Sequence, residues 1–248
     1  MKTISVLCQK GGVGKSMTCL SMAAGFHDDG KRALILDVDR QSNMSFVCGC
    51  MNKKPSLRDV IKGRADIRDA IVSSPVGDIV PSDAFLSDED LVSPSEIQCI
   101  LKAVSRRYDV AVIDCPPSLG TIVVAALVAS DYAVIPTQPN SFGYQGAKET
   151  LETVEALRSR GQAVQIAGIL PTMVNPRTNI HKQFLSVLAD LAAEHGTRLF
   201  DPIRSSTAIA EAAALQEPSF YQYAPRASAI QDYKNFYNSI KEILSDGN

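Results

Sequence analysis

Short apolar runs alternate with helical patterns along most of the chain. The apolar runs cover residues 4–8, 33–36, 110–113, 133–136 and 165–170. Runs of this length without polar alternation are typical of strands that are buried on both faces. Helical patterns lie between them, over 16–27, 96–106, 120–129, 143–158 and 179–195. The alternation predicts an α/β fold, in which helices flank a doubly wound, mostly parallel sheet.

Two further segments complete the predicted organisation. The more polar stretch 51–93 contains two short helical patterns, at 56–61 and 67–72, and a strand-like run at 78–80, so we expect an insertion within the sheet. The last pattern, 227–244, places its apolar side chains on one helical stripe, which indicates a helix packed on the sheet. Because no Pro-, Gly- or Ser-rich linker divides the chain, we expect a single domain, 1–248.

The composition indicates a globular protein and excludes some classes of partner. The 248 residues are 45% hydrophobic and 21% charged, which is typical of a globular chain, and the net charge of −2 gives no overall basic field for nucleic acid or anionic membranes. The sequence has no signal peptide and no apolar run long enough to span a bilayer. Its six cysteines are scattered, so we expect reduced thiols and a cytoplasmic location.

A glycine-rich segment between the first predicted strand and helix carries the clearest chemistry. It reads Gln9-Lys10-Gly11-Gly12-Val13-Gly14-Lys15-Ser16. Glycines let successive backbone N–H groups turn toward phosphate oxygens, and the helix that follows adds partial positive charge. In such a loop Lys15 reaches the β- and γ-phosphates and the Ser16 hydroxyl binds Mg²⁺. The segment predicts a phosphate-binding loop for ATP.

The loop differs from the ordinary P-loop pattern, because Gln9 stands where glycine is usual and Lys10 adds a second lysine. It resembles the deviant Walker A loop of the ParA/MinD family of P-loop ATPases, with the pattern Lys-Gly-Gly-x-Gly-Lys-Ser/Thr. The resemblance implies that Lys10 reaches the partner's phosphates in an ATP-sandwich dimer. It also implies that the nucleotide contacts run through Lys10, Gly11, Gly12, Val13, Gly14, Lys15, Ser16 and Met17.

Acidic residues end two predicted strands, where side chains at the carboxyl edge of a parallel sheet face the ligand crevice. Asp37 and Asp39 follow the second strand in a segment that resembles the family's switch I, although Arg40 replaces the usual proline. The resemblance implies that Asp39 orients the attacking water and Asp37 supports the Mg²⁺ shell. Asp114 ends the strand 110–113, fits a Walker B aspartate that holds Mg²⁺ through water, and precedes the switch II prolines.

The resemblance extends from Lys2 to about Ile243 and is closest to short ParA proteins that lack an N-terminal DNA-binding domain. It implies that Thr172 and Pro225 contact the adenine. It also implies an ATP hydrolase, slow without its partner, that works with ATP and Mg²⁺. Such a protein forms an ATP-dependent homodimer, binds DNA non-specifically on the nucleoid, and segregates or positions a cargo when a ParB-like partner stimulates hydrolysis.

We place a local basic strip for DNA at Lys182, Arg198, Arg204 and Arg226, since basic residues of the C-terminal third could share one face. Two alternatives belong to the same superfamily. One is a MinD-like membrane-positioned ATPase, which the C-terminal charge balance of five basic and six acidic residues disfavours. The other is an iron–sulfur or electron-transfer ATPase, for which Cys48-Gly49-Cys50 has the wrong spacing, C-x-C rather than C-x-x-C.

Overall fold

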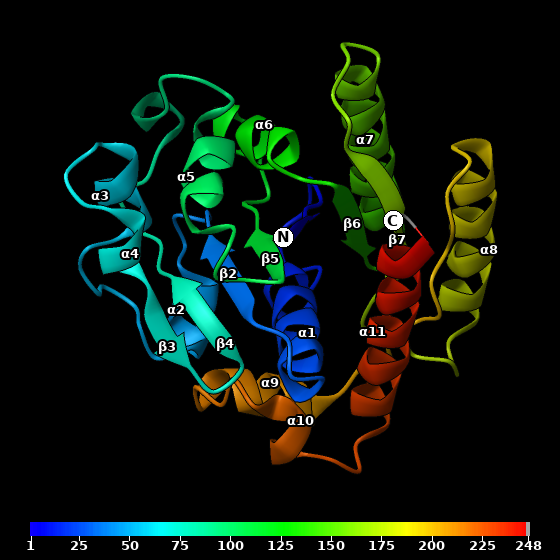
Figure 1. Ribbon diagram of the computed structural model, residues 1–248. Helices are drawn as coiled ribbons and strands as arrows, with labels where there is room; N and C mark the ends of the chain where they lie inside the picture. Colours follow the sequence, from blue (N-terminus) through cyan, green and yellow to red (C-terminus); the bar gives the residue numbers. More distant parts are fainter. Residues whose placement is uncertain (247–248) are drawn as a thin grey trace.

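A single twisted sheet organises the residues that the computed structural model describes, 1–246 (Figure 1). Within that range the sheet has seven strands, in the order β3 (Val72–Ser74), β4 (Gly77–Val80), β2 (Ala33–Asp37), β5 (Val110–Asp114), β1 (Lys2–Val6), β6 (Tyr132–Thr137) and β7 (Gln165–Pro171). All neighbours pair in parallel except β3 and β4, which are antiparallel. The predicted doubly wound, mostly parallel sheet is confirmed.

Helices follow the strands as the sequence patterns predict, with boundaries that differ by a few residues. The longer ones are α1 (Lys15–Asp28), α5 (Glu96–Val104), α6 (Thr121–Val128), α7 (Ser141–Arg158), α8 (Asn179–Glu194) and α11 (Ser228–Asp246). The sequence patterns did not predict α2 (Asn43–Val47), α9 (Thr207–Ala214) or α10 (Phe220–Tyr223).

Side chains of the central strands pack into two hydrophobic cores, one on each face of the sheet. Ile4 and Val6 of β1 pack with α1 and α11 on one face of the sheet. Ala111 and Ile113 of β5 pack with α5 and α6 on the other. Because both faces of these strands are buried, most of their positions are apolar, and Ser5, a polar exception in β1, is buried as well. This explains why the strands appear in the sequence as continuous apolar runs.

The C-terminal helix α11 lies across α1 and is part of the core. Ile230, Phe236 and Ile240 are almost completely buried. Tyr237 packs directly over Gly25 of α1, where a Cβ atom would lie 2.4 Å from the ring. The Tyr237 hydroxyl donates a hydrogen bond of 2.8 Å to Asp29. The prediction of a packed terminal helix is therefore confirmed.

The segment 51–93 adds α3 (Leu57–Ile61), α4 (Ile67–Ala70) and the 3-10 helix η1 (Asp88–Asp90) beside one end of the sheet. The predicted strand at 78–80 is present as β4. The predicted helix at 67–72 is too long, because Val72 already belongs to the edge strand β3. Three residues are too few for a two-residue period to be recognised in the sequence.

Candidate functional site

The phosphate loop joins the carboxyl end of β1 to α1. Gly12 and Gly14 have φ angles of 73° and 81°, which lie in the left-handed region where glycine is favoured. Lys15 is buried, and its Nζ donates a hydrogen bond of 3.0 Å to the carbonyl oxygen of Lys10. The lysine therefore folds back over the loop, inside the curve that a phosphate chain would fill.

Neighbouring elements hold the loop from two sides. The Thr172 hydroxyl, at the end of β7, donates a hydrogen bond of 2.8 Å to the carbonyl oxygen of Val13. The Gln138 side-chain amide donates one of 2.9 Å to the carbonyl oxygen of Gly12. On the α7 side, the backbone N–H of Gln9 donates to the Thr150 hydroxyl. These contacts order the loop because they satisfy backbone groups that its irregular path leaves without partners.

Asp37 and Asp114 end adjacent strands and are register partners in the sheet. Both oxygens of Asp37 accept hydrogen bonds, from the backbone N–H of Asp39 and from the backbone N–H and hydroxyl of Ser45. Asp114 is buried beside it, and its Oδ2 has no hydrogen-bond partner. Burial raises the pKa of both carboxyls, and for Asp114 the nearby Asp37 charge adds to that effect. The nearby Lys15 ammonium acts in the opposite direction and favours the charged form of Asp114.

The buried, unpartnered oxygen of Asp114 fits a Mg²⁺ site. Among the described residues no group of three or more His, Cys, Asp or Glu could hold a metal. Mg²⁺ in nucleotide sites takes only one or two carboxylates, with water and phosphate oxygens as its other ligands. Ser16 lies in the first turn of α1 and lines the same hollow as Asp39. Asp114 and Ser16 are thus suited to hold the ion, whereas Asp37, with both oxygens bonded, orients the start of α2.

A hollow of about 530 Å³ lies over the phosphate loop. Asp39 enters it beside Lys15, and the Asp39 Oδ1 accepts a hydrogen bond of 2.9 Å from the backbone N–H of Gln41. Pro117, from the segment after β5, lines the same hollow. The predicted loop residues, Asp39 and the switch II segment therefore meet at one edge of the sheet.

A second, mostly apolar hollow of about 440 Å³ adjoins the first and shares Gly14, Met17, Met173 and Ala213 with it. Ile203, Ile209 and Tyr233 complete its apolar wall. Its shape and lining suit a planar base.

Neither predicted base contact lines this hollow. Thr172 is buried with its hydroxyl bonded to the loop, and Pro225 does not line the hollow. The sequence patterns did not single out the lining residues Ile203, Ile209 and Ala213, because they lie on irregular or short segments. Met173 directly follows the threonine that the resemblance singled out.

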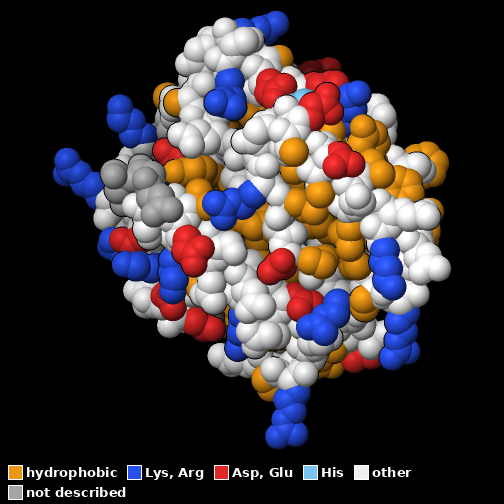
Figure 2. All heavy atoms as spheres, turned by 90° about the vertical axis from the view of Figure 1, so that its right-hand side faces the viewer, with side chains coloured by type: hydrophobic (Ala, Val, Ile, Leu, Met, Phe, Trp, Pro, Cys, Tyr) orange, Lys and Arg blue, Asp and Glu red, His pale blue; other side chains and the backbone are white. Residues whose placement is uncertain are grey.

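One residue of the predicted DNA strip is already held in an ion pair. Arg204 is held by Asp232, with Nε and Nη2 at 2.8 and 2.7 Å from its oxygens. Arg198 lies over the Phe200 ring, whereas Lys182 and Arg226 are exposed. Figure 2 shows basic side chains scattered among acidic and apolar ones on the side of the molecule that lies at the right in Figure 1. In this structure Arg204 is neutralised, so it is a poor phosphate contact.

The cysteines are free thiols in the described residues, and Cys8, Cys19, Cys50 and Cys115 are buried. Burial raises the pKa of Cys8 and Cys50 to about 11. Cys48 and Cys50 make their closest polar contacts with Met44 and with the carbonyl of Ser45. In the structure these thiols are packing groups.

A family model and two curated relatives were compared with this chain, and they agree with one another. Residues 1–166 match the family model described as an AAA domain. The chain is 30% identical to the sporulation initiation inhibitor protein Soj of Bacillus subtilis, over 99% of both chains. It is also 30% identical to the chromosome partitioning protein ParA of Caulobacter vibrioides, over 99% of this chain and 94% of that one.

Solved structures show the same fold. A complex of Cyanothece McdA with ATP superposes with a TM-score of 0.84 at 24% identity, covering 99% of this chain and 96% of that one. The cell division ATPase MinD of Pyrococcus furiosus gives a TM-score of 0.81 at 20% identity, covering 98% and 99%. With the family model matching two thirds of its length and two relatives aligned end to end, the chain belongs to the ParA/MinD family of P-loop ATPases.

Proposed function

We propose that this chain is a ParA-type partitioning ATPase. In this proposal it closes as a dimer around two ATP–Mg²⁺, binds DNA without sequence preference in that state, and is reset by hydrolysis that a ParB-like partner stimulates. The observation that carries the proposal is the meeting of Lys10, Lys15, Asp39 and Asp114 at one edge of the sheet. Full-length similarity to Soj and ParA, both named for sporulation or partitioning, supports it.

The chemistry is phosphoryl transfer to water. Lys15 leaves the Lys10 carbonyl and donates to the β- and γ-phosphate oxygens, while Asp39 orients the water and accepts its proton. The water oxygen bonds to the γ-phosphorus as the bond to the β–γ bridging oxygen breaks, giving ADP and phosphate. Mg²⁺ held through Ser16 and Asp114 would neutralise phosphate charge, and Lys10 of the partner subunit would complete the site.

The apolar hollow beside Met17 and Met173 is the place we propose for the adenine. Its contacts would combine dispersion and burial against Met17, Met173 and Ile209 with hydrogen bonds from the polar side chains at 204–207. Substitution of Ile209 by Ser should then weaken ATP and ADP binding equally, because both nucleotides carry the same base.

A membrane-positioned ATPase is the second candidate function, and the packing of the C-terminal helix α11 argues against it. The apolar face of α11 is buried on α1 and the sheet, so it is not available to enter a lipid interface. No helix within residues 1–246 has both the length and the apolar character to cross a bilayer.

The test is nucleotide-dependent binding to an unrelated DNA duplex and to vesicles containing anionic lipid. Fluorescence anisotropy with ATP, ADP or no nucleotide should show DNA binding with ATP alone, and affinity should fall steeply with salt because phosphate contacts release counterions. Tight DNA binding without nucleotide, or vesicle binding in place of DNA binding, would contradict the proposal. Bound iron or visible colour in the purified protein would support the iron–sulfur reading instead.

A further inference from the structure

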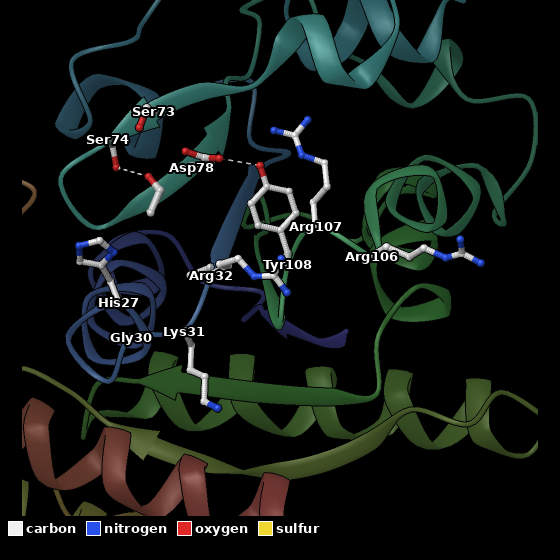
Figure 3. Close-up of a pocket in the computed structure, with 12 residues that line it drawn as sticks. His27, Gly30, Lys31, Arg32, Ser73, Ser74, Asp78, Arg106, Arg107 and Tyr108 are labelled. Atoms are coloured by element: carbon white, nitrogen blue, oxygen red, sulfur yellow. Dashed lines mark hydrogen bonds between the residues drawn. The ribbon is translucent and has the colours of Figure 1, made fainter.

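A basic hollow of about 570 Å³ lies at the opposite edge of the sheet from the phosphate loop (Figure 3). It is formed at the amino ends of three neighbouring strands, β4, β2 and β5, with the end of α1 and the segment after α5 as walls. Four basic side chains line it: Lys31, Arg32, Arg106 and Arg107. Nothing in the proposed ATP chemistry uses this edge.

The positive charge is only partly compensated. Arg32 pairs with Asp109, and Asp78 accepts a hydrogen bond of 2.6 Å from the Tyr108 hydroxyl. Within residues 1–246 the other three basic side chains form no ion pair. Among the lining side chains the four cations therefore outnumber the one carboxylate, Asp78, in a chain whose net charge is −2.

The end of α1 adds two aspartates near Lys31, and one of them, Asp29, is already paired with Lys241. A helix C-terminus carries partial negative charge on its unpaired carbonyl groups. Here the carbonyl oxygens of Gly25, Phe26 and His27 accept hydrogen bonds from the backbone N–H groups of the next few residues, which are Asp29, Lys31 and Gly30. With its last turn satisfied in this way, the helix presents few free acceptors to the hollow.

The arrangement of the cations indicates what kind of anion would fit. In Figure 3, Lys31 and Arg106 extend away from one another on two sides of the hollow, while Arg32 and Arg107 lie beside the Tyr108 ring. A small anion is usually held by donors that converge on one point, whereas a polyanion spreads its charge over many ångströms. The Ser73 hydroxyl adds a further group of the kind that contacts phosphodiesters, whereas the Ser74 hydroxyl donates to the carbonyl oxygen of Gly77.

We propose that this hollow, defined by Lys31, Arg106 and Arg107 with Ser73, is a contact surface for the phosphate backbone of DNA. It offers no projecting helix or ribbon that could enter a groove and read base edges, so contacts here would be independent of sequence. This inference rests on the proposed DNA-binding function. It places the contacts away from the C-terminal strip, where Arg204 is already bonded to Asp232.

The test compares two surfaces in the full chain. One variant carries Arg106→Gln and Arg107→Gln; the matched control carries Lys182→Gln and Arg198→Gln, which also removes two positive charges. Anisotropy with a random-sequence duplex and ATP is measured from low to moderate salt.

The loss of two phosphate contacts per protomer should weaken binding at least tenfold and reduce the salt slope by about 2 for each protomer that contacts the duplex. The control should bind almost as the parent does. Neither pair contacts the phosphate loop, so ATP affinity and thermal stability should stay unchanged.

The possible failures are distinguishable. If the parent binds DNA and the Arg106/Arg107 variant keeps both affinity and salt slope, the assignment of this hollow is wrong and the proposed function stands. If only the Lys182/Arg198 variant loses affinity, the C-terminal strip is the DNA surface. If the parent binds no duplex in any nucleotide state, the proposed DNA-binding function fails as well. Loss of anionic vesicle binding without any DNA binding would assign the hollow to membranes and overturn the proposal.

Discussion

The ammonium group of Lys10 lies 5.1 Å from the centre of the Phe142 ring. Phe142 is in the first turn of α7 and is 71% exposed, which is unusual for so large an apolar side chain. One turn further along α7, a Cβ atom at Gly146 would lie 3.1 Å from the Cβ of Lys10, so this helix and the phosphate loop are in close contact. The lysine that sets this loop apart from an ordinary P-loop is therefore held at the outer edge of the site.

This contact gives a prediction for the dimer. An exposed cation–π contact is worth about 0.5–1 kcal/mol, and Lys10 gives it up when it reaches across to the partner. Phe142→Leu keeps apolar bulk but removes the ring in both protomers, and two lost contacts make about 1–2 kcal/mol, so the ATP-dependent dimer should tighten about fivefold to thirtyfold. Sedimentation or light scattering over a concentration series measures this. Lys10→Ala is the control and should bind ATP as a monomer without dimerising; a dimer in that variant would contradict the trans role.

Lys15→Ala should lower ATP affinity by more than about 100-fold. The lysine supplies charge-assisted hydrogen bonds to two phosphates, each worth roughly 1.5–3 kcal/mol. Titration calorimetry with ATP and Mg²⁺ measures the change. Lys53→Ala is a suitable control, because Lys53 is exposed and far from the loop in sequence. An unchanged affinity in Lys15→Ala would remove the basis for the phosphate-loop assignment.

Asp39→Ala should retain ATP and accumulate the dimer. The phosphate contacts come from the loop and remain, whereas hydrolysis loses the carboxylate that orients water, at a cost of about 10²–10⁴ in rate. Single-turnover hydrolysis and ATP affinity should be measured on the same preparation. Turnover at the parent's rate would mean that Asp39, which accepts a hydrogen bond from the Gln41 backbone, only shapes the loop.

The sequence predicted the central sheet and the phosphate edge well, because both rest on local patterns. Fully buried strands leave continuous apolar runs, and the phosphate loop depends on adjacent glycines whose backbone conformation few other residues adopt. Asp37 and Asp114 could be placed at one edge because the carboxyl ends of parallel strands meet there. Their register as partners, however, needed the structure.

Two hollows could not be predicted from the sequence: the apolar one that we propose for the adenine, and the one lined by Lys31 and Arg106. The reason is the same for both. Each is assembled from segments far apart in sequence: Met17 with Ile203 and Tyr233 in one, Lys31 with Arg106 in the other. Nothing local distinguishes Arg106 from any other surface arginine. Conversely, the sequence alone showed no sign that Arg204 is paired. In the structure its guanidinium donates to Asp232, which lies 28 residues further along the chain.

Gly25→Ala should destabilise the fold through one contact. A Cβ atom there would lie 2.4 Å from the Tyr237 ring, so α1 and α11 must separate or the tyrosine must leave its position. Overpacking of this kind costs about 1–3 kcal/mol, measured as the free energy of unfolding in urea. In the Tyr237→Leu background the same change should cost clearly less, because the ring is absent. Equal costs in both backgrounds would show that the steric contact is not the cause.

Asp90 should stabilise the protein in a pH-dependent way. Its carboxylate accepts from Arg58 Nε at 2.9 Å and Lys62 Nζ at 2.8 Å, which ties α3 to η1. Burial alone would raise the pKa of Asp90, but these two cations outweigh it and lower the pKa from 3.8 to about 2. A carboxyl with a lower pKa in the folded state adds stability above its unfolded pKa. That contribution disappears as the pH falls from about 4 to about 2.

Asp90→Asn should therefore lower the free energy of unfolding at pH 7 by about 2 kcal/mol, since each pKa unit corresponds to about 1.4 kcal/mol. The difference from the parent should be constant between pH 5 and 7 and shrink below pH 4, where the parent carboxylate takes up its proton. Urea unfolding at pH 7, 5, 4 and 3 measures it. Asp201→Asn, at an exposed aspartate without an ion pair among the described residues, should show no such trend. A difference that stays constant down to pH 3 would mean that Asp90 acts through its shape and neutral hydrogen bonds, because only the ionised form can lose stability by protonation.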